Sequence, residues 1–372
     1  MRRRAVRSSA IVAAMKPDDL ARYGYDEAIQ ADFARRAAAG ASSNAVTGSL
    51  SPLPAEALVS LPALGTPERA RLRAAGLDRI RRGEVGAIIL AGGMATRFGG
   101  VVKAIVPAHG ARSFLEVKWA DLRALPGQVP IFVMASFATD AAIRAHIAEK
   151  QLSGPYDVFV QDVALRLTPS GDVYRDAAGE VSPYATGHGD LTAALRRSGV
   201  LARFRAQGGK TLFMSNVDNL AATLDPAIIG LHDELGGEMT VEVAPKVPGD
   251  KGGAPALLDG RPQVIEGFRF PPSFDQDSID VFNTNTFVFD AAAIDRDFAL
   301  PYYRVEKTVD GAKVIQFERL AGELTAFLPS RFLRVPRDGA DCRFLPVKDP
   351  EEHERQKPLI AEVVSSRRSL ED

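Results

Sequence analysis

The chain of 372 residues is 46% hydrophobic and 25% charged, values that are ordinary for a soluble globular protein. Because its 46 Lys and Arg residues nearly balance its 47 Asp and Glu residues, its charge favours neither a nucleic acid nor a membrane as partner. Cys342 is the only cysteine, which excludes an internal disulfide, and the apolar run at residues 10–15 is too short to span a membrane; both features predict a cytoplasmic protein.

The first 82 residues predict a helical segment that precedes the main domain. One helix is expected from about Pro17 to Ala39 and a second from Pro67 to about Arg82, with a Ser-, Gly-, Asn- and Pro-rich loop at residues 40–54 between them. Thr66 is a typical N-cap for the second helix, because its side-chain oxygen can accept a hydrogen bond from a free amide of the first turn.

An apolar run at Ala87–Ala91 is followed by two pairs of glycines, Gly92–Gly93 and Gly99–Gly100. The run is too short for an ordinary helix and predicts a buried strand. The backbone amides of such a loop, with Arg97 and Lys103 close by, can form a concavity that suits phosphate. From the glycines alone, a plain connection is an equally good interpretation. The loop has neither the Walker pattern nor the dinucleotide-binding pattern.

Strands and helices alternate after this loop. Strands are expected at Pro130–Ser136, Tyr156–Gln161 and Thr211–Ser215, with helices near 113–125, 140–150 and 191–206. This order predicts an α/β fold, a Rossmann-like mixed sheet, mostly parallel, with helices on both faces. Ligands of such sheets bind beyond the carboxyl ends of the strands, where the glycine-rich loop lies.

Three candidate polar sites follow along the chain. Gln161 ends a strand and its amide offers both a donor and an acceptor, although an ordinary strand-end glutamine fits as well. In Thr186–Asp190, two glycines that permit close approach of a ligand flank His188, and Asp190 is expected to cap the next helix. Asp218 follows another strand, where a carboxylate suits Mg²⁺, although such a residue alone is more often part of a turn.

The pattern changes from Glu238, where short alternating strands and the hairpin turn Asp259–Gly260 predict an insertion at residues 238–290. Within it, Glu266 could accept hydrogen bonds from hydroxyl groups, but from these residues alone a surface hairpin with solvated charges is the better interpretation. Asn283 and Asn285 are short amides that could orient vicinal hydroxyls without adding charge.

These motifs together resemble one family. Leu-Ala-Gly-Gly-x-x-Thr-Arg-x-Gly, with a lysine soon after, resembles the signature loop of sugar-1-phosphate nucleotidyltransferases. The later motifs narrow the resemblance to the UTP–glucose-1-phosphate uridylyltransferase (UDP-glucose pyrophosphorylase) family of the eukaryotic-like type; they are Thr-Gly-His-Gly-Asp at 186–190, Asn-Val-Asp-Asn at 216–219, Phe-Asn-Thr-Asn at 282–285 and the closing run at 343–348. The resemblance covers about residues 85–370.

The resemblance implies a nucleotidyltransferase (GT-A-like) catalytic domain at 83–300, which includes the insertion as a sugar-binding hairpin, and a small closing segment at 301–372. It implies transfer of the uridylyl group of UTP to glucose 1-phosphate, with pyrophosphate as the other product and Mg²⁺ as cofactor. The expected partners are therefore two small molecules, UTP and a sugar 1-phosphate, with no nucleic acid and no membrane. The oligomeric state stays open.

The resemblance also assigns roles to residues. Those expected to be catalytic are Lys103, Lys348 and Arg97, and Asp218 is the expected metal ligand. Those expected to bind the nucleotide are Ala91, Gly92, Gly93, Gln161 (at the uracil edge), Gly187 and Gly189. Those expected to bind the sugar phosphate are His188, Asn216, Lys251, Gly253, Glu266, Asn283, Asn285 and Lys307. Because both lysines must reach one phosphoryl group, the closing segment is expected to fold back over the carboxyl edge of the sheet.

Two departures and three alternatives accompany this assignment. Met94 and Ala95 stand where the family usually has leucine and glycine, and alanine at positive φ would change the loop's path or lower activity. Only 24 residues follow Lys348, so the β-helix that often follows this domain is not expected. The alternatives are transfer to another sugar 1-phosphate (N-acetylglucosamine or galactose), a UDP-sugar glycosyltransferase, which would need Asp-x-Asp at Asp218, and a non-catalytic sensor.

Overall fold

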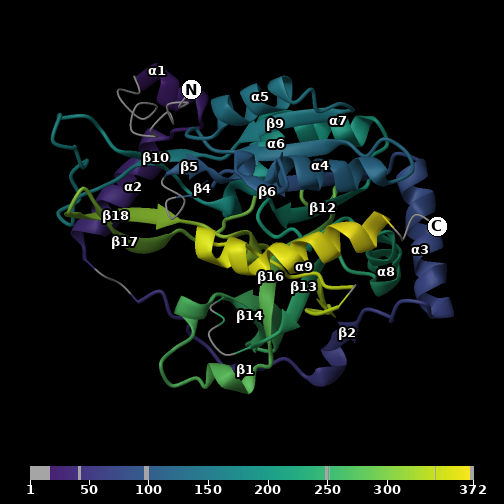
Figure 1. Cartoon of the computed structure of the whole chain (residues 1–372). Coiled ribbons are helices and arrows are strands. Elements are labelled where there is room, and N and C mark those ends of the chain that lie inside the picture. The colour runs from purple at the N-terminus through teal and green to yellow at the C-terminus, as the bar shows by residue number, and fades with distance from the viewer. Residues whose placement is uncertain are drawn as a thin grey trace.

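An eight-stranded mixed sheet forms the centre of the protein in a computed structural model that describes residues 17–40, 43–95, 100–247, 250, 252–339 and 341–368 (Figure 1). Its strand order is β2-β19-β13-β16-β12-β3-β8-β9. Only β16 runs antiparallel to its neighbours. The strands are β2 (Leu58–Ser60), β3 (Val85–Leu90), β8 (Ile131–Ala135), β9 (Tyr156–Val160), β12 (Thr211–Asn216), β13 (Met239–Pro245), β16 (Val281–Asp290) and β19 (Ser330–Arg334).

Helices cover both faces of this sheet, as the alternation of strands and helices predicts. The side chains of β3 alternate between the two cores, with Ala87 and Ile89 on one face and Ile88 on the other. The first core is completed by α3 (Pro67–Arg81), α4 (Phe114–Ala124), α5 (Asp140–Glu149), α8 (Pro226–Leu235) and α9 (Pro350–Arg368), and the second by α6 (Leu191–Arg197) and α7 (Val200–Ala206). The expected α/β fold class is confirmed.

Helix starts agree with the local sequence signals, whereas two long helices are interrupted. Thr66 caps α3, and Ser113 and Glu116 form a capping box at α4. The helix expected at 17–39 is instead α1 (Pro17–Arg22) and α2 (Glu27–Ala38), because Asp26 caps a new start. The helix expected at 191–206 breaks between α6 and α7 at Gly199, whose φ of +72° lies in the left-handed region.

The N-terminal segment is more than the expected helical segment, because it contributes strands to two sheets. Part of the expected loop forms β1 (Leu50–Pro52), which pairs with β14 (Ala254–Leu258), and β2 pairs with β19 at the sheet edge. Similarly, β13 of the expected insertion and β19 of the expected closing segment both lie inside the main sheet. The expected boundaries at 82, 238 and 300 therefore cut through one sheet.

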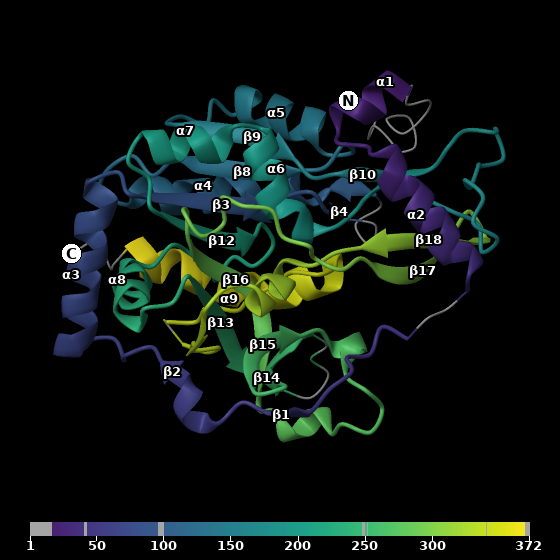
Figure 2. The ribbon, with the colours of Figure 1, turned by 180° about the vertical axis from the view of Figure 1, so that it is seen from behind.

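The smaller hairpins lie around this sheet. β14 and β15 (Arg261–Ile265) form the hairpin with the Asp259–Gly260 turn, as expected, and with β1 they make a three-stranded sheet below the main one (Figure 2). The other hairpin strands are β4 (Met94–Ala95) with β5 (Val101–Val102), β6 (Pro107–His109) with β7 (Arg112–Ser113), β10 (Val163–Leu165) with β11 (Pro183–Ala185), and β17 (Tyr303–Val309) with β18 (Ala312–Glu318). Among the described helices, none has the length and apolar character that a bilayer crossing needs.

Candidate active site

The glycine-rich loop and the Asp218 loop leave the sheet side by side. β3 and β12 are parallel neighbours whose last residues, Leu90 and Asn216, are in register. Directly after them, Ala91 donates its backbone amide to Met134 (2.8 Å) and Val217 donates to Leu90 (3.0 Å). Both loops therefore start at the same carboxyl edge, where the fold predicts a ligand site.

Lys103 and Asp218 meet at this edge although 115 residues separate them. The Nζ of Lys103, which follows β5, forms an ion pair with Oδ2 of Asp218, and both side chains are mostly buried. A lysine beside a strand-end carboxylate can hold a phosphate and a divalent cation side by side. No group of three or more His, Cys, Asp or Glu side chains gathers among the described residues, so phosphate oxygens and water would complete the shell of an ion on Asp218.

The closing segment folds back over the Asp218 loop, as expected. Asn219 binds it through both ends of its amide: Oδ1 accepts from the backbone of Leu345 (2.8 Å) and Nδ2 donates to the carbonyl of Arg343 (3.3 Å). Asn219 is only 1% exposed. Because both amide atoms are used inside the protein, Asn219 positions the closing segment and is not a second metal ligand beside Asp218.

Val347, which precedes Lys348 in the chain, holds this part of the closing segment against the Asp218 loop. The backbone amide of Val347 donates to the carbonyl of Asp218 (3.1 Å), so Lys348 is one residue from a direct contact with the metal candidate. Its side chain is exposed and forms no ion pair with a described residue. Lys103, Asp218 and the backbone beside Lys348 are therefore brought to one edge from three distant parts of the chain.

Gln161 lies against the start of the glycine-rich loop. Its side chain is buried and its Nε2 occupies the space that a Cβ on Gly92 would need, so a larger residue at position 92 would displace the Gln161 amide. The loop is held from the other side by Ser136, whose Oγ donates to the carbonyl of Gly92 (2.8 Å). An amide at this position can pair with the edge of a base whose phosphates lie on the loop.

The glycines beside His188 pack closely against the backbone of another segment. Gly187 has a φ of +106°, and a Cβ there would lie 2.5 Å from the carbonyl oxygen of Arg319. A Cβ on Gly189 would lie 2.5 Å from the backbone nitrogen of Leu320. The space that these glycines leave open on their Cβ side is therefore filled by the protein's own backbone, and the expectation that they bind the nucleotide stays a prediction.

Asp190 is not the expected N-cap of α6, because no cap hydrogen bond forms. Its carboxylate instead accepts from the backbone of Asp162 (3.0 Å) and from Oγ1 of Thr186 (2.6 Å), and it pairs with Arg319. Arg319 also pairs with the side chain of Asp162 (2.8 Å). Burial raises the pKa of Asp190 to about 6, and Arg319 opposes this rise. This buried network fixes the turn that carries His188.

His188 presents one defined hydrogen-bond donor. Its Nδ1 accepts from the backbone amide of Ala321 (3.0 Å), so in the neutral ring the proton lies on Nε2. Burial lowers the pKa of His188 to about 4, which keeps the ring neutral near pH 7. A neutral donor of this kind suits a sugar hydroxyl or a phosphate oxygen.

Asn216, Asn283 and Asn285 are joined by hydrogen bonds. Nδ2 of Asn285 donates to Oδ1 of Asn216 (3.0 Å), and the backbone of Asn285 donates to Oδ1 of Asn283 (3.0 Å). Asn285 has a φ of +55°, a left-handed conformation that asparagine tolerates better than most residues. Its Oδ1 is buried and accepts no hydrogen bond from the described residues, so it is available to a ligand hydroxyl.

Glu266 and Asn283 converge on Gly322, which the sequence did not identify. A Cβ on Gly322 would lie 3.2 Å from Oε1 of Glu266 and 3.5 Å from Nδ2 of Asn283. The backbone of Gly253 hydrogen-bonds to Glu266, which lines a cavity of about 850 Å³. Burial and then the charge of Glu323 raise the pKa of Glu266 to about 7.

The raised pKa of Glu266 predicts a pH-dependent stability. Its native pKa lies above the usual 4.5, so its contribution to stability is complete below pH 4.5 and is lost as the pH rises through 7. Glu266→Gln, which is neutral at every pH, should therefore melt near the wild-type temperature at pH 4 and be more stable at pH 8, by at most about 3 kcal/mol. A difference in melting temperature that stays constant over this range would contradict the assignment.

A family model described as UTP–glucose-1-phosphate uridylyltransferase matches residues 32–359. The chain belongs to this family. Among its relatives are the probable UTP–glucose-1-phosphate uridylyltransferase of Schizosaccharomyces pombe, 30% identical over 303 residues, and the enzyme of Musa acuminata, 31% identical over 285. These alignments include 74% and 70% of this chain but only 58% and 59% of the relatives. The chain therefore spans less than two thirds of their length.

Solved structures of uridylyltransferases and related enzymes share the fold. A Leishmania major UDP-glucose pyrophosphorylase mutant in complex with UDP-glucose superposes with a TM-score of 0.72 at 22% identity, covering 95% of this chain and 79% of that one. A UDP-N-acetylglucosamine pyrophosphorylase from Trypanosoma brucei, in complex with an inhibitor, gives 0.74 at 20% identity and covers 94% and 81%. At such identities the likeness shows the fold alone.

Four further positions of this uridylyltransferase family member were expected from the sequence to affect the site. Lys307 on β17 pairs with Glu318 on β18 (3.9 Å), and its role toward the sugar phosphate stays a prediction. Arg97 and Lys251 lie outside the described residues. Ala95 pairs with Val101 in the β4–β5 hairpin, and this extended backbone does not need glycine, so the expected penalty of alanine at positive φ is corrected.

Proposed function

We propose that the chain transfers the uridylyl group of UTP to glucose 1-phosphate and releases pyrophosphate, with Mg²⁺ as cofactor. The observation that carries this proposal is the convergence of Lys103, Asp218 and the Lys348 segment at the carboxyl edge of β3 and β12. The names of the curated relatives support the same reaction.

The reaction needs charge stabilisation rather than a base. The attacking phosphate oxygen of glucose 1-phosphate is already anionic near pH 7, and it attacks the α-phosphorus of UTP in line with the leaving pyrophosphate. Lys103 holds the triphosphate and Lys348 lies between the sugar phosphate and the α-phosphate, so two fixed cations bring the two anions together. Asp218 would hold Mg²⁺, which supplies further screening of the phosphate oxygens.

The groups proposed to bind the sugar are Glu266, His188 and the three asparagines joined by hydrogen bonds, Asn216, Asn283 and Asn285. These groups offer several hydrogen bonds with little fixed positive charge, which suits the hydroxyls of a hexose. Specificity for glucose over N-acetylglucosamine or galactose is part of the proposal. The glycosyltransferase alternative is disfavoured, because Asp218 has no second aspartate two residues away: positions 216 and 220 are asparagine and leucine. A cytoplasmic location is also proposed; the buried single cysteine, Cys342, fits it.

Base selection should depend on Gln161. In wild type we expect UTP to be preferred over CTP, because a site built on hydrogen bonds rejects an analogue that leaves its groups unpaired. Gln161→Ala should reduce the ratio of kcat/KM for UTP to that for CTP by about tenfold, the value of one hydrogen bond. Gln207→Ala, which changes an exposed glutamine after α7, is the matched control. An unchanged ratio in Gln161→Ala would show that Gln161 does not contact the base.

A panel of sugar 1-phosphates tests the proposed substrate. With UTP and Mg²⁺, pyrophosphate release should be fastest with glucose 1-phosphate and slower with galactose 1-phosphate and N-acetylglucosamine 1-phosphate. A different preferred sugar would keep the reaction but change the substrate. Binding of UDP-glucose without pyrophosphate release from any sugar would instead support the sensor alternative.

A further inference from the structure

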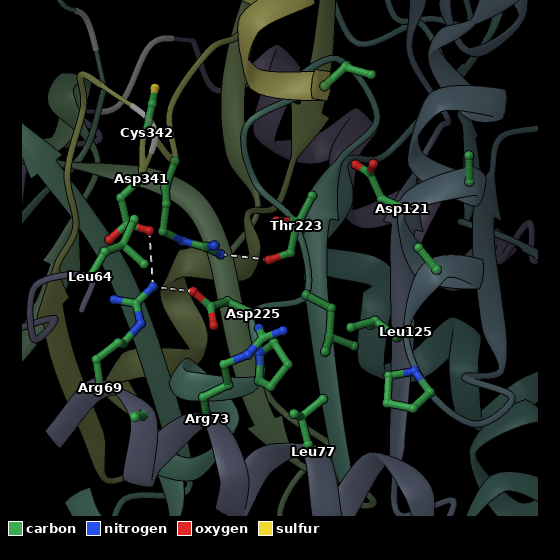
Figure 3. Close-up of a pocket in the computed structure, with 18 of the residues that line it drawn as sticks. Leu64, Arg69, Arg73, Leu77, Asp121, Leu125, Thr223, Asp225, Asp341 and Cys342 are labelled. Carbon is green, nitrogen blue, oxygen red and sulfur yellow. Dashed lines mark hydrogen bonds and ion pairs between the residues drawn. The ribbon is translucent and has the colours of Figure 1, made fainter. Parts of the chain in front are cut away.

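A second cavity lies apart from the Lys103–Asp218 edge, between α3, α4 and the start of the closing segment (Figure 3). Its volume is about 920 Å³, within the size range of small-molecule sites. α3, which forms one wall, is held tightly on α8: a Cβ on Gly230 of α8 would collide with the backbone of Leu72 in α3. The wall is therefore a fixed part of the fold.

Arginine predominates among the charged groups of this cavity. Five arginines line it against three aspartates; they are Arg69, Arg73, Arg81, Arg112 and Arg343 against Asp121, Asp225 and Asp341. Arg69 is neutralised between Asp225 and Asp341, and Arg343 pairs with Glu242. Arg81 and Arg112 form no ion pair with any acidic residue that the structure describes. These two side chains can bind an added anion without losing an internal partner.

The rest of the lining is largely apolar. Leu77 and Leu125 face the cavity in Figure 3, and Pro126, Leu224 and Val364 also line it. An inorganic anion alone would leave this surface in contact with water. A molecule that joins an anionic group to an apolar body would use both parts of the lining, because burial of its apolar surface adds to the ion pair.

We propose that this cavity is a binding site for a small amphipathic anion, a phosphate or carboxylate attached to an aromatic or aliphatic group. The site is distinct from the proposed catalytic edge, so it does not depend on the proposed function.

The walls of the cavity continue into both loops of the catalytic edge. Thr223 lies at the end of the loop that begins with Asp218, and Arg343 begins the run that ends at Lys348. Nη2 of Arg343 donates to the carbonyl of Thr223 (2.8 Å). Arg69 also joins the two segments, because it pairs with Asp225 on one and with Asp341 on the other. A ligand that fills the cavity would therefore contact the two segments that carry Asp218 and Lys348, which makes the cavity a place where a ligand can change turnover.

The test uses 1-naphthyl phosphate as probe and 1-naphthol as its uncharged counterpart, with binding measured by calorimetry. Wild type should bind the phosphate at least tenfold more tightly than the naphthol. Arg81→Gln/Arg112→Gln should weaken the phosphate by about tenfold or more. The control Arg35→Gln/Arg71→Gln, which changes two exposed arginines away from the cavity, should bind as wild type does. Lys103→Gln should also bind as wild type, because the probe is not at the catalytic edge.

Several results would overturn the proposal. They are equal binding by wild type and Arg81→Gln/Arg112→Gln, equal binding of phosphate and naphthol, no binding to wild type, or loss of binding only in Lys103→Gln. If the double variant fails to fold, wild type still decides the question. 1-Naphthyl phosphate should slow the phenylglyoxal modification of Arg81 or Arg112 severalfold in a peptide-mapping experiment, and no slowing at either residue would contradict the site.

Discussion

Lys103→Ala is expected to lower kcat by about 100-fold or more while the protein keeps its fold, because the loss of one preorganised charge at a phosphoryl group costs this much. The ion pair with Asp218 shows that Lys103 already lies at the candidate metal ligand, without substrate. Steady-state kinetics at saturating UTP measure the effect. Near wild-type turnover would remove Lys103 from the mechanism.

Lys210→Ala is a matched control for this variant. Lys210 also pairs with a carboxylate, Glu84 (2.7 Å), but it lies at the opposite end of β12, before Thr211. Its loss should change stability slightly and leave kcat unchanged. If both lysine variants lowered kcat equally, the effect would reflect damage to β12 and not loss of a charge at the phosphates.

Lys348→Ala is expected to lower kcat far more than it weakens UTP binding, because its charge is matched to the transition state. The side chain is exposed and has no ion pair with a described residue, so its removal should cost less than about 0.5 kcal/mol of stability. Lys348→Arg should restore little activity, since a planar guanidinium does not replace a compact ammonium. Kinetics and a UTP titration of both variants separate these effects.

The control for Lys348 is Lys357→Ala on α9, which changes an exposed lysine that pairs with Glu354. It should keep wild-type kinetics. An unchanged kcat in Lys348→Ala would show that the closing segment folds over the catalytic edge without taking part in the reaction. A parallel rise in KM with unchanged kcat would assign Lys348 to ground-state binding alone.

The features predictable from the sequence are those that depend on neighbouring residues. The caps of α3 and α4 follow from Thr66 and from the Ser113–Glu116 pair, whose partners lie within three residues. The buried strands β3, β8 and β12 follow from short apolar runs between turn signals. Together they were enough for the α/β class and for the position of the glycine-rich loop.

Features that depend on distant pairing were not predictable. β2 and β19 pair across more than 260 residues, and nothing in their local pattern indicates which strand each joins. The same limit explains Asp190, which looks like a helix cap in sequence but is held by Arg319, 129 residues away. The packing of Gly187 and Gly189 against the backbone of Arg319 was not predictable for the same reason.

Some residues of the candidate site were predictable from the sequence, and others were not. The resemblance assigned Lys103 and Asp218 to one site, and the two side chains do form an ion pair, because a family resemblance carries long-range information that a local pattern lacks. Gly322 was missed, although a side chain there would crowd both Glu266 and Asn283, because a single glycine in a short turn gives no sequence signal.

The most direct test of the account follows both products of one reaction by ³¹P NMR. With UTP, glucose 1-phosphate and Mg²⁺, wild type should form UDP-glucose and pyrophosphate in equal amounts, and Lys103→Ala should form neither at a comparable rate. Release of UDP or inorganic phosphate, or no consumption of UTP by the folded protein, would contradict transfer of a uridylyl group at the edge where Lys103, Asp218 and Lys348 meet.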